Sequence, residues 1–247
     1  MSQKNTAFSI FPIGFIKTCY PDKFGVPRQS GLVKNTISEL EILPEWQPEF
    51  ALHGLDGYSH VWIHFIFHLN TNTKYHPKVH PPRLGGQSIG VFATRSPHRP
   101  NPLGLSLCEI FKIENNKIYL YGVDLVDGTP IVDIKPYLPQ FENLPQARGG
   151  WALDSVNDVR SIRVEFSVDA LSVLDLWMRK TGRSELKTVI EEVIQQDPRP
   201  LVYRGFENKV SPYRNEHAFR LYDGDVHFQF IEENIARVVS ITFAPDA

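Results

Sequence analysis

The segment from Gly90 to Ser106 holds the side chains of this chain that are best suited to chemistry. Arg95, His98 and Arg99 lie there among three prolines. Each proline fixes its own φ and pushes the preceding residue toward extended geometry, so we expect a stiff loop. A guanidinium can donate two parallel hydrogen bonds to a carboxylate or a phosphate. The segment therefore predicts an anion-binding loop, and the alternative is an ordinary surface loop with solvated arginines.

Two other short segments combine turn-forming residues with polar side chains. Pro27–Gln29 lies between Gly25 and Gly31, and its proline constrains the backbone beside Arg28. Asp127–Pro130 is predicted to form a tight turn, because Asp-Gly and Thr-Pro are typical turn pairs. The backbone and the threonine hydroxyl of such a turn could also hold the edges of an adenine or a ribose.

Three histidines, His60, His64 and His68, repeat every four residues and raise the question of a zinc site. The residues between them are aromatic and β-branched, which favours a strand over a helix. On a strand, residues four apart stand about 13 Å apart, whereas zinc–ligand bonds are near ~2 Å. We therefore expect no metal site, although His68, where the strand ends, could line a pocket or be a plain core or surface histidine.

The charges are unevenly distributed along the chain. The 247 residues carry a formal net charge of −2, which argues against a general polyanion binder. From Asn70 to Cys108, however, there is no acidic residue. Such asymmetry is typical of a surface for an anionic partner. The basic residues of this acid-free segment are Lys74, Lys78, Arg83, Arg95 and Arg99.

Composition is compatible with a packed, cytoplasmic protein. Hydrophobic residues make up 42% of the chain, which is enough for a core. The first six residues are polar, and no apolar run approaches the length of a membrane span. Cys19 and Cys108 lie in apolar, strand-like contexts, so we interpret them as reduced core residues rather than as a disulfide or a metal site.

The first part of the chain reads as β-structure. Many short strands at close spacing predict a mainly β barrel or sandwich. The run from 58 to 69 is almost continuously apolar, which predicts a strand buried on both sides. Asn115-Asn116 is the expected hairpin turn. The strands are expected at residues 8–16, 36–43, 58–69, 88–94, 105–113, 117–123 and 131–135, with a long loop at 70–87.

The second part reads as a smaller α+β domain. Ser167 is the expected N-cap of a helix that runs to about Lys180, with Leu171, Leu174 and Met178 on one face. A second apolar stripe covers 186–194 and is stopped by Pro198. A hairpin around Asp223-Gly224 and a strand at 238–243 follow. We place the boundary between residues 149 and 158, which gives domains at 1–150 and 155–247.

The three polar segments, in this order, resemble the motifs of the TsaA/TrmO family. They read Val26-Pro-Arg-Gln29, Gly90-Val-Phe-Ala-Thr-Arg-Ser-Pro-His-Arg-Pro-Asn-Pro-Leu-Gly-Leu-Ser106 and Asp127-Gly-Thr-Pro-Ile-Val-Asp-Ile-Lys-Pro-Tyr137. The family's C-terminal signature is similar to Asp197-Pro-Arg-Pro200 followed by Tyr203-Arg204, with one extra residue before the tyrosine. The resemblance implies a barrel domain that binds S-adenosylmethionine near the interface of a homodimer.

The resemblance also implies an activity and a set of site residues. It implies methylation of the exocyclic nitrogen of threonylcarbamoyl-adenosine beside the anticodon, in the anticodon loop of tRNA. The implied cofactor contacts are Pro27, Arg28, Gln29, His68, Arg95, Leu105, Asp127, Gly128, Thr129 and Pro130. The implied substrate contacts are Arg99, Asp197, Arg199, Tyr203 and Arg204. No catalytic acid or base is implied, and no metal.

Some alternatives stay open on the sequence. No G-x-G-x-x-G or P-loop lysine motif occurs, so a nucleotide cofactor would bind outside the doubly wound fold. The chain could instead be an RNA-binding module without catalysis, or an S-adenosylmethionine enzyme with a small-molecule acceptor. Arg199 could contact RNA or could pair with Asp197 and brace the turn. Because the three motifs precede Trp151, the first domain alone is expected to bind the cofactor, and the second domain is expected to recognise the tRNA.

Overall fold

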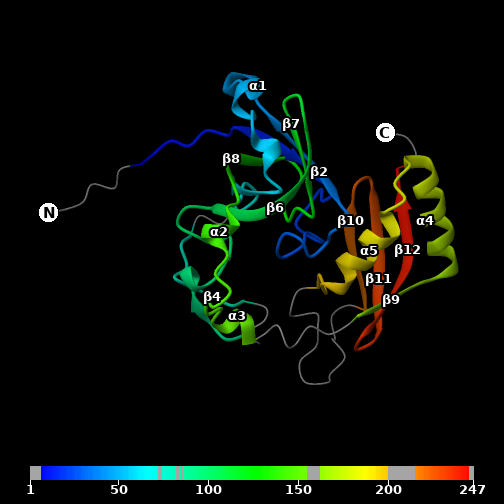
Figure 1. Ribbon diagram of the computed structural model, residues 1–247. Helices are drawn as coiled ribbons and strands as arrows, with labels where there is room; N and C mark the ends of the chain where they lie inside the picture. The colour runs from blue at the N-terminus through cyan, green and yellow to red at the C-terminus, as the bar shows by residue number, and fades with distance from the viewer. Residues whose placement is uncertain are drawn as a thin grey trace.

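The computed structural model describes residues 7–71, 74–81, 84, 86–154, 162–199 and 215–244 (Figure 1). It contains a closed six-stranded barrel followed by a four-stranded sheet with two helices, which confirms the expected fold class. The barrel strands run in the order β1-β2-β7-β6-β3-β8, and every neighbouring pair is antiparallel. Their bounds are β1 Gly14–Lys17, β2 Ile37–Ile42, β3 His60–Ile66, β6 Leu103–Glu114, β7 Lys117–Tyr121 and β8 Thr129–Pro136.

Three connections leave the barrel at the same end. Neighbouring strands alternate in direction, so the chain exits at this end after β1, β3 and β7. The register agrees, because Ile37 pairs with Tyr121 and Ile66 pairs with Leu103. The connections are residues 18–36, 67–102 and 122–128. Each of the three polar motifs lies in one of these connections or runs from it into the next strand. We call this end of the barrel the motif rim.

The opposite end carries shorter or more compact connections. The β6–β7 hairpin turns at Asn115-Asn116 as predicted, and Asn115 has a φ of 56°. The 43–59 connection folds as three short helical turns, η1 Pro44–Trp46, α1 Pro48–Ala51 and η2 Leu55–Gly57. After β8 the chain leaves this end through α2 Pro139–Glu142.

Two further elements lie on the side of the motif rim. A two-stranded ribbon, β4 Lys78–Val79 with β5 Ile89–Gly90, lies within the 67–102 connection. The short helix α3 Trp151–Asp154 contacts the same connection, because Trp151 Nε1 donates to the carbonyl of Ala93.

Several expected strands differ from the observed ones. β3 is buried on one side only, because Val61, Ile63 and Phe65 fill the barrel while the alternate residues stay half-buried outside. The expected strand at 8–16 begins only at Gly14, with backbone hydrogen bonds from Ile13 onward; Pro12 has no N–H to donate, and Phe8 is 85% exposed. The expected strand at 88–94 ends at Gly90 and continues as the short helical turn η4 Val91–Ala93.

The second unit is a sheet covered on one face by two helices (Figure 1). Its order is β10-β11-β12-β9, and only β9 runs parallel to its neighbour. The strands are β10 Glu216–Leu221, β11 Gly224–Glu232, β12 Ile235–Phe243 and β9 Arg163–Phe166; the helices are α4 Val168–Thr181 and α5 Leu186–Gln195. The β10–β11 hairpin turns at Tyr222-Asp223, one residue before the expected pair. No helix in the described ranges is long and apolar enough to cross a membrane.

The helices follow their sequence signals closely. The Ser167 hydroxyl accepts a hydrogen bond from the Ala170 N–H at 3.1 Å, which confirms the predicted N-cap of α4. The apolar residues of the predicted α5 stripe are all buried: Leu186, Val189, Ile190, Val193 and Ile194. The α4 face was predicted less well, because Leu171 is 37% exposed. The predicted Leu174 is buried and the predicted Met178 packs partly buried against the core. Ala170 and Trp177 complete the buried face with Leu174, at four- and three-residue steps.

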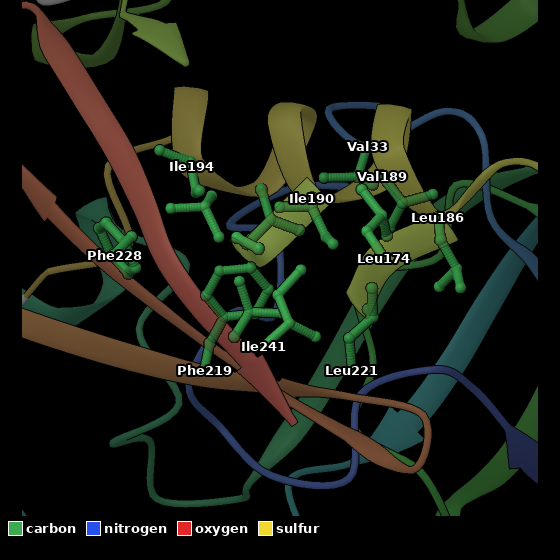
Figure 2. Close-up of a cluster of buried hydrophobic side chains, with 14 of the residues drawn as sticks. Val33, Leu174, Leu186, Val189, Ile190, Ile194, Phe219, Leu221, Phe228 and Ile241 are labelled. Carbon is green, nitrogen blue, oxygen red and sulfur yellow. The ribbon is translucent and has the colours of Figure 1, made fainter. Parts of the chain in front are cut away.

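The connection after β1 is part of the second unit's core. Cys19, Tyr20 and Val33 are at most 1% exposed and belong to the same apolar cluster as α4, α5 and the second sheet. Figure 2 shows Val33 among the side chains of these elements. Burial raises the pKa of both Cys19 and Cys108 to about 12, so both thiols stay protonated and unreactive. The 18–36 connection therefore links the barrel rigidly to the second unit.

Candidate functional site

The motif rim brings the first two polar motifs into direct contact. The Nη1 atom of Arg95 donates a hydrogen bond to Oε1 of Gln29, across 66 residues of sequence. Near His68, one further bond joins the two connections and a second closes the 67–102 connection on itself. Lys23 donates to the carbonyl of Leu69, and the Asn70 amide donates to the carbonyl of Pro97 at 2.9 Å. We call the predicted anion-binding segment from Gly90 to Ser106 the arginine loop. This loop and the Pro27–Gln29 segment therefore form one surface.

The arginine loop is braced by its own side chains. Thr94 Oγ1 donates to the carbonyl of Val91 at 2.7 Å, and Trp151 Nε1 donates to the carbonyl of Ala93 at 2.9 Å. Arg99 folds back onto the loop, where its Nη1 donates to the carbonyl of Thr94 at 2.9 Å. Its guanidinium also lies 5.6 Å from the centre of the Phe92 ring. Of the two arginines, Arg95 is exposed and Arg99 is half-buried, so Arg99 stiffens the loop that presents Arg95.

The Pro27–Gln29 segment is held from the second unit. Nη2 of Arg28 donates to the backbone carbonyl of Asp197 at 3.1 Å. The Gln29 amide donates to the backbone carbonyl of Arg28 at 2.6 Å and accepts from Arg95 through its other atom. Both ends of the segment turn at glycines with positive φ, Gly25 at 85° and Gly31 at 79°. The segment therefore lies between the barrel and the second unit with its polar side chains already engaged.

The Asp127–Pro130 turn is fixed by the connection after β1. The Asp127 carboxylate accepts from the Thr18 N–H at 2.8 Å, and its own N–H donates to the carbonyl of Tyr20 at 2.8 Å. Thr129 is buried, and its hydroxyl donates to the carbonyl of Val126 at 2.6 Å, so this hydroxyl closes the turn. Gly128 has a φ of 74° and open space where a Cβ would be, so a ligand can approach it from that side, while its N–H donates to the carbonyl of Ile16 at 2.8 Å.

One polar pair at the motif rim escaped the sequence analysis. The hydroxyl of Ser106, which is 4% exposed, donates to the carboxyl of Asp124 at 2.6 Å. Burial raises the pKa of Asp124, while hydrogen bonds from Ser106 and the Ser30 backbone and the nearby charge of Arg95 act in the opposite direction. The signal was present, because Asp124 is the one carboxyl within the apolar run 123–126.

Two further predicted cofactor contacts, His68 and Leu105, lie at the surface of the barrel. His68 is exposed and follows β3 at the rim, and Leu105 is 45% exposed on β6, where it pairs with His64. Among the described residues no group of three side chains could hold a metal ion. Tyr203 and Arg204 lie outside the described residues, as does Arg83.

The turn that follows α5 is less exposed than its sequence suggested. The side chains of Arg199 and Asp197 are 12% and 18% exposed. Arg199 donates through Nε and Nη2 to the two carboxylate oxygens of Asp197, at 2.7 and 3.1 Å. The bracing pair that was the alternative to an RNA contact is therefore present.

The match to known proteins covers both units of the chain. The profile of the tRNA-methyltransferase O N-terminal domain matches residues 15–143, and that of the TrmO C-terminal domain matches residues 160–244. The chain belongs to the tRNA-methyltransferase O family. Like the solved TrmO of Pseudomonas aeruginosa, it joins a barrel to a smaller domain: that structure superposes with a TM-score of 0.78 at 33% identity and covers 98% of this chain and 100% of its own.

Two curated relatives extend the TrmO match. The tRNA (adenine(37)-N6)-methyltransferase of Escherichia coli is 42% identical over 82% of this chain and 86% of its own length. RcsF of Pseudomonas aeruginosa, provisionally named an S-adenosylmethionine-dependent methyltransferase, is 40% identical over 94% of this chain and 97% of its own.

Proposed function

We propose that this chain methylates tRNA: it transfers the methyl group of S-adenosylmethionine to the exocyclic nitrogen of the adenosine beside the anticodon, and this adenosine carries a threonylcarbamoyl group. Membership of the TrmO family and the names of the relatives support the reaction. The observation that carries the proposal is the meeting of the motifs at the motif rim, where Arg95 bonds Gln29.

The residues at the motif rim fit the cofactor chemically. S-adenosylmethionine combines an anionic carboxylate, two cationic centres and an adenosine. The rim offers an exposed guanidinium on Arg95, the carboxylate of Asp127 and an approachable backbone at Gly128. We assign the cofactor to Pro27–Gln29, His68, Arg95, Leu105 and Asp127–Pro130. Asp124 is proposed to orient Arg95 rather than to touch the cofactor.

The proposed chemistry asks the protein mainly for orientation. The bound cofactor would supply an activated methyl group by in-line displacement: the N6–CH3 bond forms as the sulfonium S–CH3 bond breaks, S-adenosylhomocysteine leaves, and the N6 proton is released to solvent. The braced arginine loop and the Asp127–Pro130 turn are both fixed by hydrogen bonds to backbone atoms. Such fixed contacts hold two reactants in line without rearrangement during the reaction. The absence of a catalytic triad among the sequence motifs agrees with this demand.

The acid-free segment is the proposed RNA surface. Lys74, Lys78 and His80 are exposed there, and the exposed aromatic rings of Tyr75 and Phe92 lie in the same segment. Lysine side chains can contact phosphates, and aromatic rings can stack on the unpaired bases of an RNA loop. The carboxylate of a threonylcarbamoyl group would match a cationic loop. We therefore propose that the anticodon loop binds across residues 74–99.

A second copy of the chain is proposed to cover the barrel next to this surface. Leu103 and Leu105 are 41% and 45% exposed on β6, and Phe92 is 70% exposed in the arginine loop. Exposed apolar side chains that gather near a site are typical of an interface. We propose a homodimer that works in the cytoplasm, where the free thiols of Cys19 and Cys108 stay reduced. Light scattering of the purified protein would give the oligomeric state.

Methyl transfer in vitro tests the proposed function. The purified chain, S-adenosylmethionine and tRNA from cells without the enzyme should give N6-methylated threonylcarbamoyl-adenosine, measured by nucleoside mass spectrometry. Arg95→Ala should lower the rate at limiting cofactor. Lys112→Ala is the matched control, because Lys112 is exposed near the opposite end of the barrel, where it contacts Glu114 and the Tyr119 ring.

The control reactions separate the alternatives. Binding of tRNA without any heat from S-adenosylmethionine would indicate an RNA-binding module. Cofactor binding without methylation of tRNA would indicate a small-molecule acceptor.

A further inference from the structure

One contact of the second unit with the motif rim is the turn from Asp197 to Arg199, directly after α5. Asp197 has a φ of 46°, in the left-handed region that a non-glycine residue adopts at a cost. Its backbone carbonyl accepts the hydrogen bond from Arg28 at 3.1 Å, although the two residues are 169 positions apart. The conformation of this turn therefore sets the position of the Asp197 carbonyl that accepts from Arg28.

Arg199 holds the turn in that conformation. Its two parallel hydrogen bonds to the Asp197 carboxylate, at 2.7 and 3.1 Å, form the fork geometry that only arginine provides. Its guanidinium carbon lies 3.4 Å from the centre of the Phe230 ring in β11. With a side chain only 12% exposed, Arg199 is packed between a carboxylate and a ring of the second unit. This placement suits a brace better than a contact to an RNA phosphate.

The contacts continue from this brace to the proposed cofactor site. Arg199 fixes Asp197, Asp197 accepts from Arg28, and the backbone carbonyl of Arg28 accepts from the Gln29 amide at 2.6 Å. The Oε1 atom of that Gln29 side chain accepts from Arg95. Each step is a hydrogen bond, and the chain of contacts runs from the core of the second unit to the exposed arginine of the rim.

We propose that Arg199 is a positioning residue for cofactor binding, which it supports by orienting Arg28 and Gln29 through Asp197. The inference rests on the proposed function, because it concerns the binding of S-adenosylmethionine at the motif rim. It gives the second unit a role in cofactor affinity, whereas the family-based expectation assigned this turn to the tRNA.

A double-mutant cycle on the full-length chain tests the proposal. Calorimetry measures the Kd for S-adenosylmethionine of the unaltered chain, Arg199→Ala, Arg28→Ala and the double variant. We expect Arg199→Ala to raise this Kd about tenfold, the size of one lost charged hydrogen bond. In the Arg28→Ala background the same change should add little, because Arg199 acts through Arg28. Arg237→Ala is the matched control, since Arg237 pairs with Glu165 on the same sheet.

Two further measurements separate positioning from loss of folding. Hydrogen exchange at residues 26–31 without cofactor should become faster in Arg199→Ala, while exchange in the barrel strands should not change. In steady-state kinetics the KM for the cofactor should rise, with kcat and the KM for tRNA unchanged. If Arg199→Ala does not fold, Arg199→Lys serves instead, because it keeps the charge and the aliphatic stem but loses the fork; it should show the same shift.

An unchanged cofactor Kd in Arg199→Ala, or strictly additive effects in the cycle, would overturn the proposal. A raised KM for tRNA with an unchanged cofactor Kd would indicate that Arg199 contacts the RNA, and this would also overturn the proposal. These results differ from a failure of the proposed function itself, in which the unaltered chain would give no heat with S-adenosylmethionine.

Discussion

At the scale of single residues, the proposed site depends most on Arg95, which is assigned to the cofactor, and on Asp124, which is proposed to orient it. Arg95 is exposed and held by Gln29, whereas Asp124 lies half-buried behind it with the Ser106 hydroxyl on its carboxyl. A carboxyl so placed can keep a guanidinium oriented without competing for the ligand. The loss of one charged hydrogen bond costs about 1.5–3 kcal/mol, so Arg95→Ala should weaken cofactor binding roughly ten- to 100-fold. Calorimetry with S-adenosylmethionine measures this, and an unchanged Kd would make Arg95 a structural residue only.

The raised pKa of Asp124 gives a prediction on stability and pH. Above the ordinary value of 3.8, the folded protein retains a proton that the unfolded chain has released. Unfolding releases that proton, so this group lowers the free energy of unfolding as pH rises from 3.8 toward its folded pKa. The side chain of Asp124→Asn does not titrate. The free energy of unfolding of the unaltered chain minus that of this variant should therefore fall as pH rises through this interval. Denaturant titrations at several pH values measure the difference, and a constant difference would contradict the assignment.

Ser106→Ala provides a control with a defined sign. The hydroxyl of Ser106 favours the ionised form of Asp124, so its removal should raise the pKa of that carboxyl further. The interval over which stability falls with pH should then widen toward higher pH. A narrower interval would mean that the hydroxyl does not donate to the carboxyl.

At the scale of elements, the 18–36 connection is the part of the fold that unites barrel and second unit. Its Cys19 carbonyl accepts from the Tyr222 N–H at 2.7 Å, and its backbone at Lys34 and Asn35 donates to Glu192 of α5 at 3.0 and 3.2 Å. A loop held by two units has little freedom. The Pro27–Gln29 segment is therefore prearranged before any ligand binds.

A pair of glycine substitutions tests this packing. Gly25 and Gly31 have similar φ values, 85° and 79°, but a Cβ on Gly25 would lie 3.0 Å from Phe219, whereas one on Gly31 would meet open space. Both alanine variants should carry the backbone cost of about 1–2 kcal/mol, and Gly25→Ala should lose about 1–3 kcal/mol more by overpacking. Thermal unfolding measures both, and equal losses would show that the contact with Phe219 is not tight.

Local patterns in the sequence predicted most elements, and long-range partners account for the errors. The N-cap at Ser167 and the Asn115-Asn116 turn depend on neighbouring residues, and both are confirmed. The strand at 58–69 was expected to be buried on both faces, but β3 is buried on one face only. An aromatic run does not show which face of a strand meets a core. Arg99 donates to backbone carbonyls of its own loop, which no residue pattern reveals, and its expected contact with the substrate stays a prediction.

At the scale of the whole molecule, the barrel and the second unit have separate cores, and the connection after β1 adds Cys19, Tyr20 and Val33 to the core of the second unit. A fragment ending at residue 150 would keep the three motifs but expose Tyr20 and Val33, which are fully buried, and would remove the Asp197 acceptor of Arg28. The sequence suggested that this fragment binds the cofactor alone; from the structure we expect a lower melting temperature and a Kd raised at least tenfold, by calorimetry. A fragment with the affinity of the full chain would show that the second unit is dispensable for the cofactor.

The central claim is that the motif rim methylates the threonylcarbamoyl-adenosine of tRNA, and the most direct measurement is the nucleoside composition of cellular tRNA. Cells lacking the gene should contain threonylcarbamoyl-adenosine without its N6-methyl derivative. The unaltered gene should restore the methylated nucleoside, Lys112→Ala should restore it equally, and Arg95→Ala should restore much less. Methylated nucleoside at an unchanged level in the deletion strain, with no second enzyme in that strain, would contradict the account.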